Sequence, residues 1–249
     1  MTPRLAGTRH CLVFALLLAL VLPSASQQPP AHSRDFARIQ SHAENGDPAA
    51  QLQLAHAFER GTGTDVDYMQ AEHWYRKAAN SGDPLAQNDL GVFYARARGG
   101  QPDYAQAYMW YLRSAVSGYA VAQNNLGYLY STGHGVPRDD AEAARWYKKS
   151  AIQGFAPAQT NLAALYSQGR GVAQSDELAA KWIRSAAQQG WASAENELGL
   201  IYERGRGVTA DLEQARVWYR RSVDHGSPEA AHNLARLSAS AAIIPAAHP

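Results

Sequence analysis

The feature that most constrains the fold of this chain is an internal repeat with a period of 36 residues. Tryptophans hold one position of the period: Trp74, Trp110, Trp146, Trp182 and Trp218. Three further positions keep the same interval: Gly46, Gly82, Gly118, Gly154, Gly190 and Gly226; Leu54, Leu90, Leu126, Leu162, Leu198 and Leu234; and Ala50, Ala86, Ala122, Ala158, Ala194 and Ala230. A fixed period of this length indicates stacked supersecondary units, because one such unit cannot bury its apolar face alone.

Each unit carries two apolar patterns with helical spacing, which in the third unit are Ala122, Leu126 and Tyr130, then Ala143, Trp146, Tyr147 and Ala151. Such spacing predicts two amphipathic helices. Paired glycines between the patterns, Gly133 and Gly135 in this unit, can adopt positive φ and stop the first helix. The tryptophans are expected in the core, since they recur on one apolar face, and the loop glycines are read as helix terminators. The sequence therefore predicts an all-α fold.

Helix starts are marked in every unit. Asp-Pro or Ser-Pro pairs precede first helices at Asp47, Asp83 and Ser227, which places a capping side chain before a proline at the first helical position. Capping boxes are predicted at the second helices: Asp67 with Gln70, Asp103 with Gln106, Asp139 with Glu142 and Asp211 with Gln214. In the fourth unit Ser175 is a candidate cap, but Leu178 cannot complete a box.

These residues resemble the Sel-one-like repeat family, a relative of the tetratricopeptide repeats. Its units read Ala-x-x-x-Leu-Gly-x-x-Tyr, then Gly-x-Gly-Val, then Ala-x-x-Trp-Tyr-x-x-Ala-Ala-x-x-Gly, and the third unit matches almost in full from Ala122 to Gly154. Departures are local: Ala97 replaces a loop glycine, Thr64 and Gly100 replace the loop valine, and Ile183 replaces a tyrosine. The resemblance implies a right-handed α-solenoid, a superhelix of antiparallel helix pairs with the first helix of each pair on the concave side.

Domain boundaries follow from the repeat and its flanks. We expect a signal peptide at 1–26, a linker at 27–32, an N-terminal capping helix at 33–46, five complete repeats plus a terminal half repeat at 47–238, and a flexible tail at 239–249. Arg4 and Arg9 precede the apolar run 11–22, which is too short for a bilayer core, and small residues follow at Ser24 and Ser26. The alternative is an N-terminal membrane anchor.

Composition excludes several classes of function. Cleavage after Ser26 would leave 21 cationic and 22 acidic residues, so no broad positive field for nucleic acid or membrane surfaces is expected. Cleavage would also remove Cys11, the only cysteine, and with it any disulfide. The histidines show no i, i+4 ligand pair, and Gly-x-Gly lacks the third glycine and preceding strand of a nucleotide site. We therefore predict no metal, no cofactor and no catalysis.

Two classes of function stay open. The resemblance implies an adaptor for a protein or peptide partner, and bacterial members of the family serve regulation or assembly of the envelope. The short signal before a chain of repeats adds the expectation of export to a bacterial periplasm. The alternative is a hydrolase, because some cysteine-rich members of the family are associated with β-lactam hydrolysis. The paired cysteines of that subgroup are missing here.

The candidate binding site is the concave face. Positions two before each core leucine lie about 160° around the helix from it and are predicted to point away from the core. They are Leu52, Asn88, Asn124, Thr160, Asn196 and His232. The family resemblance implies that the positions two after the leucines lie on the same surface: His56, Val92, Tyr128, Ala164, Leu200 and Arg236. The amides of the asparagines would donate to and accept from an extended peptide. Alternatively, the asparagines only bond the backbone of a neighbouring unit.

A second candidate surface is a basic column along the second helices. It comprises Arg76, Lys77, Arg113, Lys148, Lys149, Arg184, Arg220 and Arg221. Cations near helix C-termini also favour the helix dipole and keep a convex surface soluble, so solvation alone is the preferred interpretation.

Overall fold

The computed structural model describes residues 31–98 and 100–243, and within these ranges the chain forms twelve α-helices and no strand. The helices are α1 (Ala31–Glu44), α2 (Pro48–Arg60), α3 (Tyr68–Asn80), α4 (Pro84–Ala95), α5 (Tyr104–Val116), α6 (Ala120–Thr132), α7 (Asp140–Ala151), α8 (Ala156–Gln168), α9 (Asp176–Ala187), α10 (Ala192–Arg204), α11 (Leu212–Asp224) and α12 (Pro228–Ile243). The pairs α2–α3 to α10–α11 are the first to fifth repeats.

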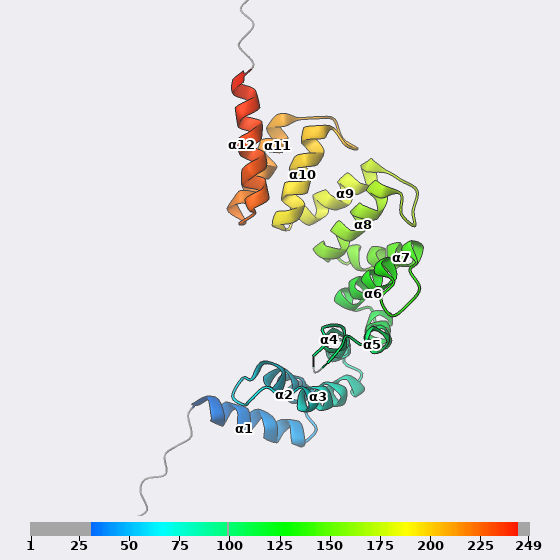
Figure 1. Ribbon diagram of the computed structural model, residues 1–249, viewed down its shortest axis with the longest axis vertical. Helices are drawn as coiled ribbons and strands as arrows, with labels where there is room; N and C mark the ends of the chain where they lie inside the picture. Colours follow the sequence, from blue (N-terminus) through cyan, green and yellow to red (C-terminus); the bar gives the residue numbers. More distant parts are fainter. Residues whose placement is uncertain (1–30, 99, 244–249) are drawn as a thin grey trace, which may run out of the picture.

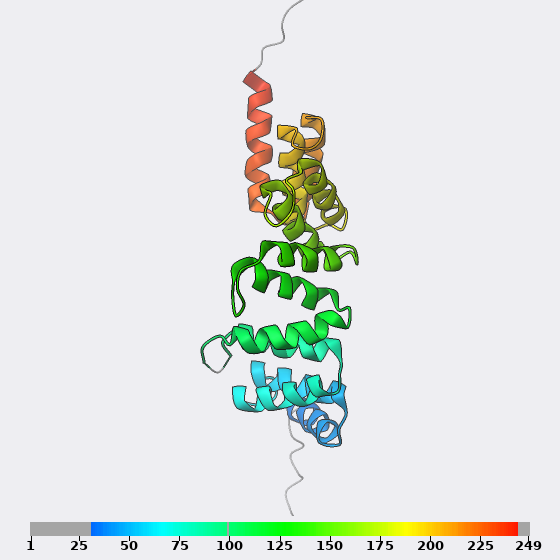
Figure 2. The same cartoon turned by 90° about the vertical axis from the view of Figure 1, so that its right-hand side faces the viewer.

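The repeats stack into a curved solenoid. Each helix packs against the helices before and after it in the chain. Figure 1 shows an arc in which α4 and α6 lie on the inner side and α5 and α7 on the outer side. The helix axes turn along the stack, so that α1 to α3 run across the long axis and α12 runs nearly along it (Figures 1 and 2). The predicted all-α solenoid with a 36-residue repeat is confirmed.

The predicted helix caps form, but not as complete boxes. Asp67 accepts from the backbone N–H groups of Met69 and Gln70 at 3.0 Å, and the other predicted Asp and Ser caps likewise accept from the first turn. The backbone N–H of Asp67, which a box would pair with the Gln70 side chain, instead donates to the carbonyl of Phe58 at 2.9 Å. Equivalent bonds join Asp103 to Tyr94, Asp139 to Tyr130, Ser175 to Tyr166 and Asp211 to Tyr202. Each second helix is therefore tied to the end of its own first helix.

The core is built on the tyrosine beside each tryptophan more than on the tryptophan. Tyr75, Tyr111, Tyr147 and Tyr219 are buried, as is Ile183 at the same position. Trp74 and Trp110 are also buried, but Trp146, Trp182 and Trp218 are only half-buried, which corrects the expectation that all five lie in the core. These three tryptophans pack against the core clusters while remaining partly exposed.

Glycines in the first helices make room for these tyrosine rings. A Cβ atom on Gly127 would lie 2.7 Å from Cδ1 of Tyr147, and Gly91 and Gly199 face Tyr111 and Tyr219 in the same way. Contacts this short require a displaced ring. The glycine after the core leucine therefore allows close packing of the two helices within a repeat.

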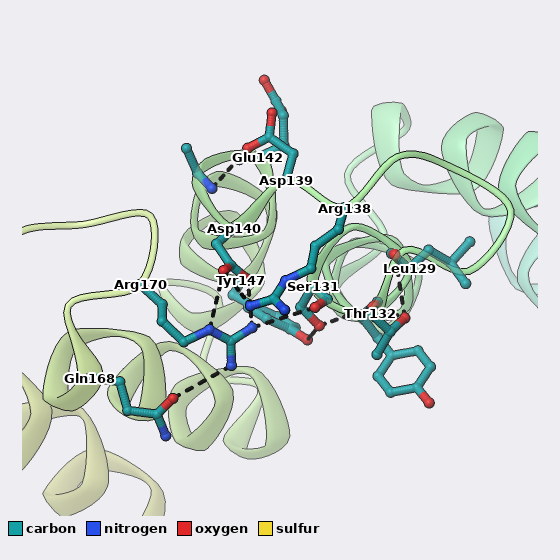
Figure 3. Close-up of polar contacts among 12 residues, drawn as sticks. Leu129, Ser131, Thr132, Arg138, Asp139, Asp140, Glu142, Tyr147, Gln168 and Arg170 are labelled. Atoms are coloured by element: carbon teal, nitrogen blue, oxygen red, sulfur yellow. Dashed lines mark hydrogen bonds and ion pairs between the residues drawn. The ribbon is translucent and has the colours of Figure 1, made fainter.

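The loops within the repeats make contacts with the preceding repeat. Arg170 donates through Nε and Nη2 to both carboxylate oxygens of Asp140, at 3.2 and 2.6 Å, and Figure 3 shows its guanidinium also facing Ser131. A Cβ on the adjacent Gly171 would lie 2.2 Å from the carbonyl carbon of Asp140. The second loop glycine thus permits close approach to the preceding repeat, a role beyond the predicted termination. Arg206 and Gly207 repeat this arrangement on Asp176.

The first and last helices of the solenoid differ in length from the predicted segments. Helix α1 begins at Ala31, two residues before the expected capping helix, and ends at Glu44. Helix α12 continues to Ile243, past the start of the expected tail at residue 239, because the alanine-rich segment contains no helix breaker before Pro245. The predicted signal peptide and most of the linker lie outside the described residues. Within residues 31–98 and 100–243, no helix is both long enough and apolar enough to span a bilayer.

Candidate functional site

Asparagine side chains join successive first helices on the inner side of the solenoid. Asn125 donates to Oδ1 of Asn88 at 3.0 Å, Asn161 to Asn124 at 3.0 Å, and Asn233 to Asn196 at 2.9 Å. We call these three bonds the asparagine rungs. Each rung links the position two before one core leucine to the position one before the next. The predicted asparagines therefore bond a neighbouring repeat, but through its side chain and not its backbone.

The rungs explain one wrong expectation. Leu52 and Asn88 are buried, with Asn88 only 4% exposed, although the helical geometry predicted that both would point away from the core. The geometry places them away from their own core but against the next repeat, which covers them. Asn124, Thr160 and Asn196 are half-buried for the same reason.

Some of the remaining predicted site residues line cavities, and the others do not. His56 is held within the solenoid, since its Nδ1 lies 2.6 Å from the Tyr75 hydroxyl and its Nε2 lies 3.1 Å from Asp89. Leu200 packs in the last core cluster, and His232 is exposed. Val92 and Tyr128 line one cavity, and Thr160 lines another. Val92, Tyr128 and Thr160 of the predicted binding face therefore line two separate cavities and not one continuous surface.

The larger cavity lies where a rung is missing, between the fourth and fifth repeats. Thr160 stands in place of the accepting asparagine, and its hydroxyl donates to Pro157 of its own helix at 2.8 Å. Glu197 stands in place of the donating asparagine. The cavity has a volume of about 400 Å³, and its lining includes Ala163, Ile183, Ile201 and Glu197. We call it the α8–α10 cavity.

The smaller cavity, of about 280 Å³, lies between the second and third repeats and is aromatic. Tyr104, Tyr111 and Tyr128 line it together with Val92 and Arg96. Within the described residues, the Tyr111 hydroxyl makes no hydrogen bond, because Ala95 stands where Glu59, Ser131 and Glu203 partner the equivalent tyrosines. Burial raises the pKa of Tyr111 far above its ordinary range. This hydroxyl remains a neutral donor at physiological pH.

Sequence reasoning missed these residues for identifiable reasons. The donors of the rungs, Asn125, Asn161 and Asn233, also follow the 36-residue period, so a second periodic column was available as a signal. Tyr104 and Arg96 belong to positions that vary between repeats. No periodic signal marks them.

The basic column on the outer helices covers the exposed tryptophan faces. Lys149 lies 3.9 Å from the centroid of the Trp146 ring, and Lys77, Arg113 and Arg221 lie over Trp74, Trp110 and Trp218 at 4.4 to 4.6 Å. Cation–π contacts of this kind stabilise exposed sites by about 0.5 to 1 kcal/mol. They give these cations a structural role on the convex side.

Ionisable groups in the described segments are engaged mainly in holding repeats together. Hydrogen bonds from Arg236 lower the pKa of the Glu203 carboxyl, and those from Arg170 lower the pKa of Asp140. No group of three or more His, Cys, Asp or Glu side chains suited to a metal ion occurs within residues 31–98 and 100–243.

Comparison with known proteins agrees with this architecture. The family model described as the Sel1 repeat matches residues 48–83, 84–119, 120–155, 156–191 and 192–227. A Sel1 repeat protein from Oxalobacter formigenes has a similar structure, with a TM-score of 0.73 and 28% identity over 82% of this chain and 81% of that one. The comparison with curated proteins found no match.

Two other solved structures share the fold less closely. The c5321 protective antigen of uropathogenic Escherichia coli is 30% identical over 84% of this chain, with a TM-score of 0.51, and this chain spans 52% of its length. A Sel1 repeat protein from Klebsiella pneumoniae is 24% identical, with a TM-score of 0.53 over 82% of this chain and 99% of that one.

Proposed function

Because this chain belongs to the Sel1 repeat family, we propose that it is an exported, non-catalytic adaptor whose concave face binds an extended segment of a partner protein. The observation that carries the proposal is the pair of cavities between successive first helices, one aromatic and one acidic. The larger cavity opens where Thr160 and Glu197 replace a pair of asparagines, and the smaller one contains the Tyr111 ring, whose hydroxyl lacks the partner that the equivalent tyrosines have.

The arrangement suits an extended segment better than a compact ligand. In the rungs Asn124 and Asn196 accept through Oδ1, and their amide N–H groups have no hydrogen-bond partner among the described residues. Tyr128 is 48% exposed. A peptide lying along the inner helices would meet polar groups at repeat intervals and side-chain cavities between them. Main-chain contacts of that kind supply affinity, and the cavities supply specificity.

Site-specific photocrosslinking tests the proposed face. A p-benzoylphenylalanine residue placed at Tyr128, on inner helix α6, should crosslink a discrete partner in intact cells. The same residue at Met109, on outer helix α5, is the matched control because the two side chains are 48% and 47% exposed. Equal crosslinking from both positions, or from Met109 alone, would contradict the concave assignment.

Export is part of the proposal and has its own test. The apolar run 11–22 followed by Ser24 and Ser26 supports cleavage before Gln27 and release into the periplasm of a bacterium. Mass spectrometry of the purified native protein should find Gln27 at the N-terminus. Recovery of an intact Met1 or Thr2 on membrane-bound protein would instead indicate an anchor.

A further inference from the structure

We propose that the α8–α10 cavity is a specificity pocket for a lysine or arginine side chain of the bound segment. This inference rests on the proposed function and names the chemistry of one partner residue. It starts from the missing asparagine rung, since Thr160 and Glu197 replace the two asparagines that join α4 to α6, α6 to α8 and α10 to α12. The replacement leaves both an opening and a carboxylate.

Glu197 differs from the other acids at the repeat junctions. Asp89 pairs with His56, Asp140 with Arg170, Asp176 with Arg206 and Glu203 with Arg236, at 2.6 to 3.1 Å. Within the described residues, Glu197 has neither an ion pair nor a hydrogen bond, although it is half-buried. A partly desolvated carboxylate without a counter-charge favours a cation from outside the chain.

The cavity also provides for the stem of such a side chain. Ala179 and Ile183 from α9, each 5% exposed, line it together with Ile201 and Ala194 from α10. Lysine and arginine lay their methylene stems on apolar surface while the charged group reaches a polar rim. The volume of about 400 Å³ falls in the range of sites that enclose a ligand.

The net charge of the lining selects a cation and not an anion. The cavity contains Asp176, Glu197 and Arg206 as its charged side chains. Arg206 donates to Asp176 at 3.1 Å, so the pair is neutralised internally and the charge of Glu197 remains. An acidic side chain in this cavity would meet an uncompensated like charge.

Methyl NMR of the mature chain tests the pocket directly. N-acetyl-arginine-N-methylamide and N-acetyl-lysine-N-methylamide are titrated into protein labelled at isoleucine methyl groups. Saturable shifts are expected at Ile183 and Ile201, with Ile39 on α1 as the internal reference. The norleucine analogue, which keeps the stem without the charge, should bind at least tenfold more weakly.

Two carboxylate variants decide the role of Glu197. Glu197→Gln should weaken the arginine probe at least tenfold, whereas Glu197→Asp and the matched control Glu213→Gln should retain the preference for arginine over norleucine. Unchanged binding to Glu197→Gln, or equal binding of the norleucine probe, would overturn the pocket assignment. If crosslinking from Tyr128 persisted in that case, the concave adaptor would stand and only the basic specificity would fail.

Discussion

The side-chain amide of Asn161 donates to Oδ1 of Asn124 at 3.0 Å, which joins two residues 37 apart in the chain across one repeat junction. Removing the acceptor leaves a partly buried amide unpaired, at a cost of about 1 to 3 kcal/mol. We therefore expect Asn124→Ala to lower the free energy of unfolding by that amount in urea titrations. The same change at His232, which is exposed at the equivalent position of the last helix, is the control and should be nearly neutral.

The missing rung can be restored. Thr160→Asn combined with Glu197→Asn should create a bond between α8 and α10 and raise the free energy of unfolding by about 0.5 to 1.5 kcal/mol. Each single change leaves one of the original side chains in place, so the asparagine pair itself, and the full gain, should appear only in the double variant. An additive result would show that the two positions do not meet.

A substitution at Gly127 tests the close packing of the first helix against the Tyr147 ring. Gly127→Ala places a Cβ atom 2.7 Å from the Tyr147 ring, and overpacking of this kind costs about 1 to 3 kcal/mol. In the background Tyr147→Ile the same change should cost little, because the fourth repeat pairs Ala163 with Ile183 at these positions. Chemical denaturation of the four proteins in this cycle measures the coupling.

Glu195 is a buried acid where the first four repeats have glutamine. It is 0% exposed, and its Oε2 lies 2.7 Å from Nδ1 of His225. Its Oε1 accepts no hydrogen bond within the described residues, although it lies 3.4 Å from Nε of Arg221 in an ion pair. The equivalent glutamines, Gln51, Gln87, Gln123 and Gln159, donate to the backbone carbonyls of Ala43, Ala79, Ala115 and Ala151. A carboxylate cannot make that bond.

We therefore expect Glu195→Gln to stabilise the fold by about 1 kcal/mol, since the amide can donate to the chain and still accept from His225. The reverse change, Gln159→Glu, should destabilise the fourth repeat by at least as much. Differential scanning fluorimetry compares the melting temperatures of wild type, Glu195→Gln and Gln159→Glu. A lower melting temperature for Glu195→Gln would show that the ion pair outweighs the missing hydrogen bond.

The ion pair of Asp140 predicts a dependence of stability on pH. Hydrogen bonds from Arg170 and Arg138 lower the pKa of Asp140 in the folded state. A lowered folded pKa means that the contribution is fully present above the unfolded value of about 3.9 and is lost as pH falls through the folded value. The stability difference between wild type and Asp140→Asn, on the order of 1 kcal/mol, should therefore shrink below about pH 4.

The control for this pH series is Asp65→Asn, which removes an exposed carboxylate in the loop after α2. Its stability difference from wild type should be small over the whole range. Urea titrations at several pH values provide the measurement. A difference for Asp140→Asn that stayed constant down to pH 2 would contradict the lowered pKa.

The site was only partly predictable. Val92 and Tyr128, which the family resemblance grouped on one surface, line the same cavity, because both lie on first helices of adjacent repeats. The burial of Asn88 did not follow from counting around the helix, because the count ignores the neighbouring repeat. Whether the asparagines bind a partner through their free amide donors stays a prediction, as does the choice between the concave face and the basic column.

By itself, the sequence determined the period, the two helices of each repeat, their capping residues and the stacking of repeats into a solenoid. The helices and their caps depend on residues close together in the chain, and the period shows directly as recurrence every 36 residues. The tertiary structure decided what depends on contacts 30 to 39 residues apart, such as Arg170 on Asp140 and Asn161 on Asn124. It also decided that Thr160 and Glu197 open a cavity. The angle at which repeats stack is set by the packing of all these side chains together, and no local pattern encodes it.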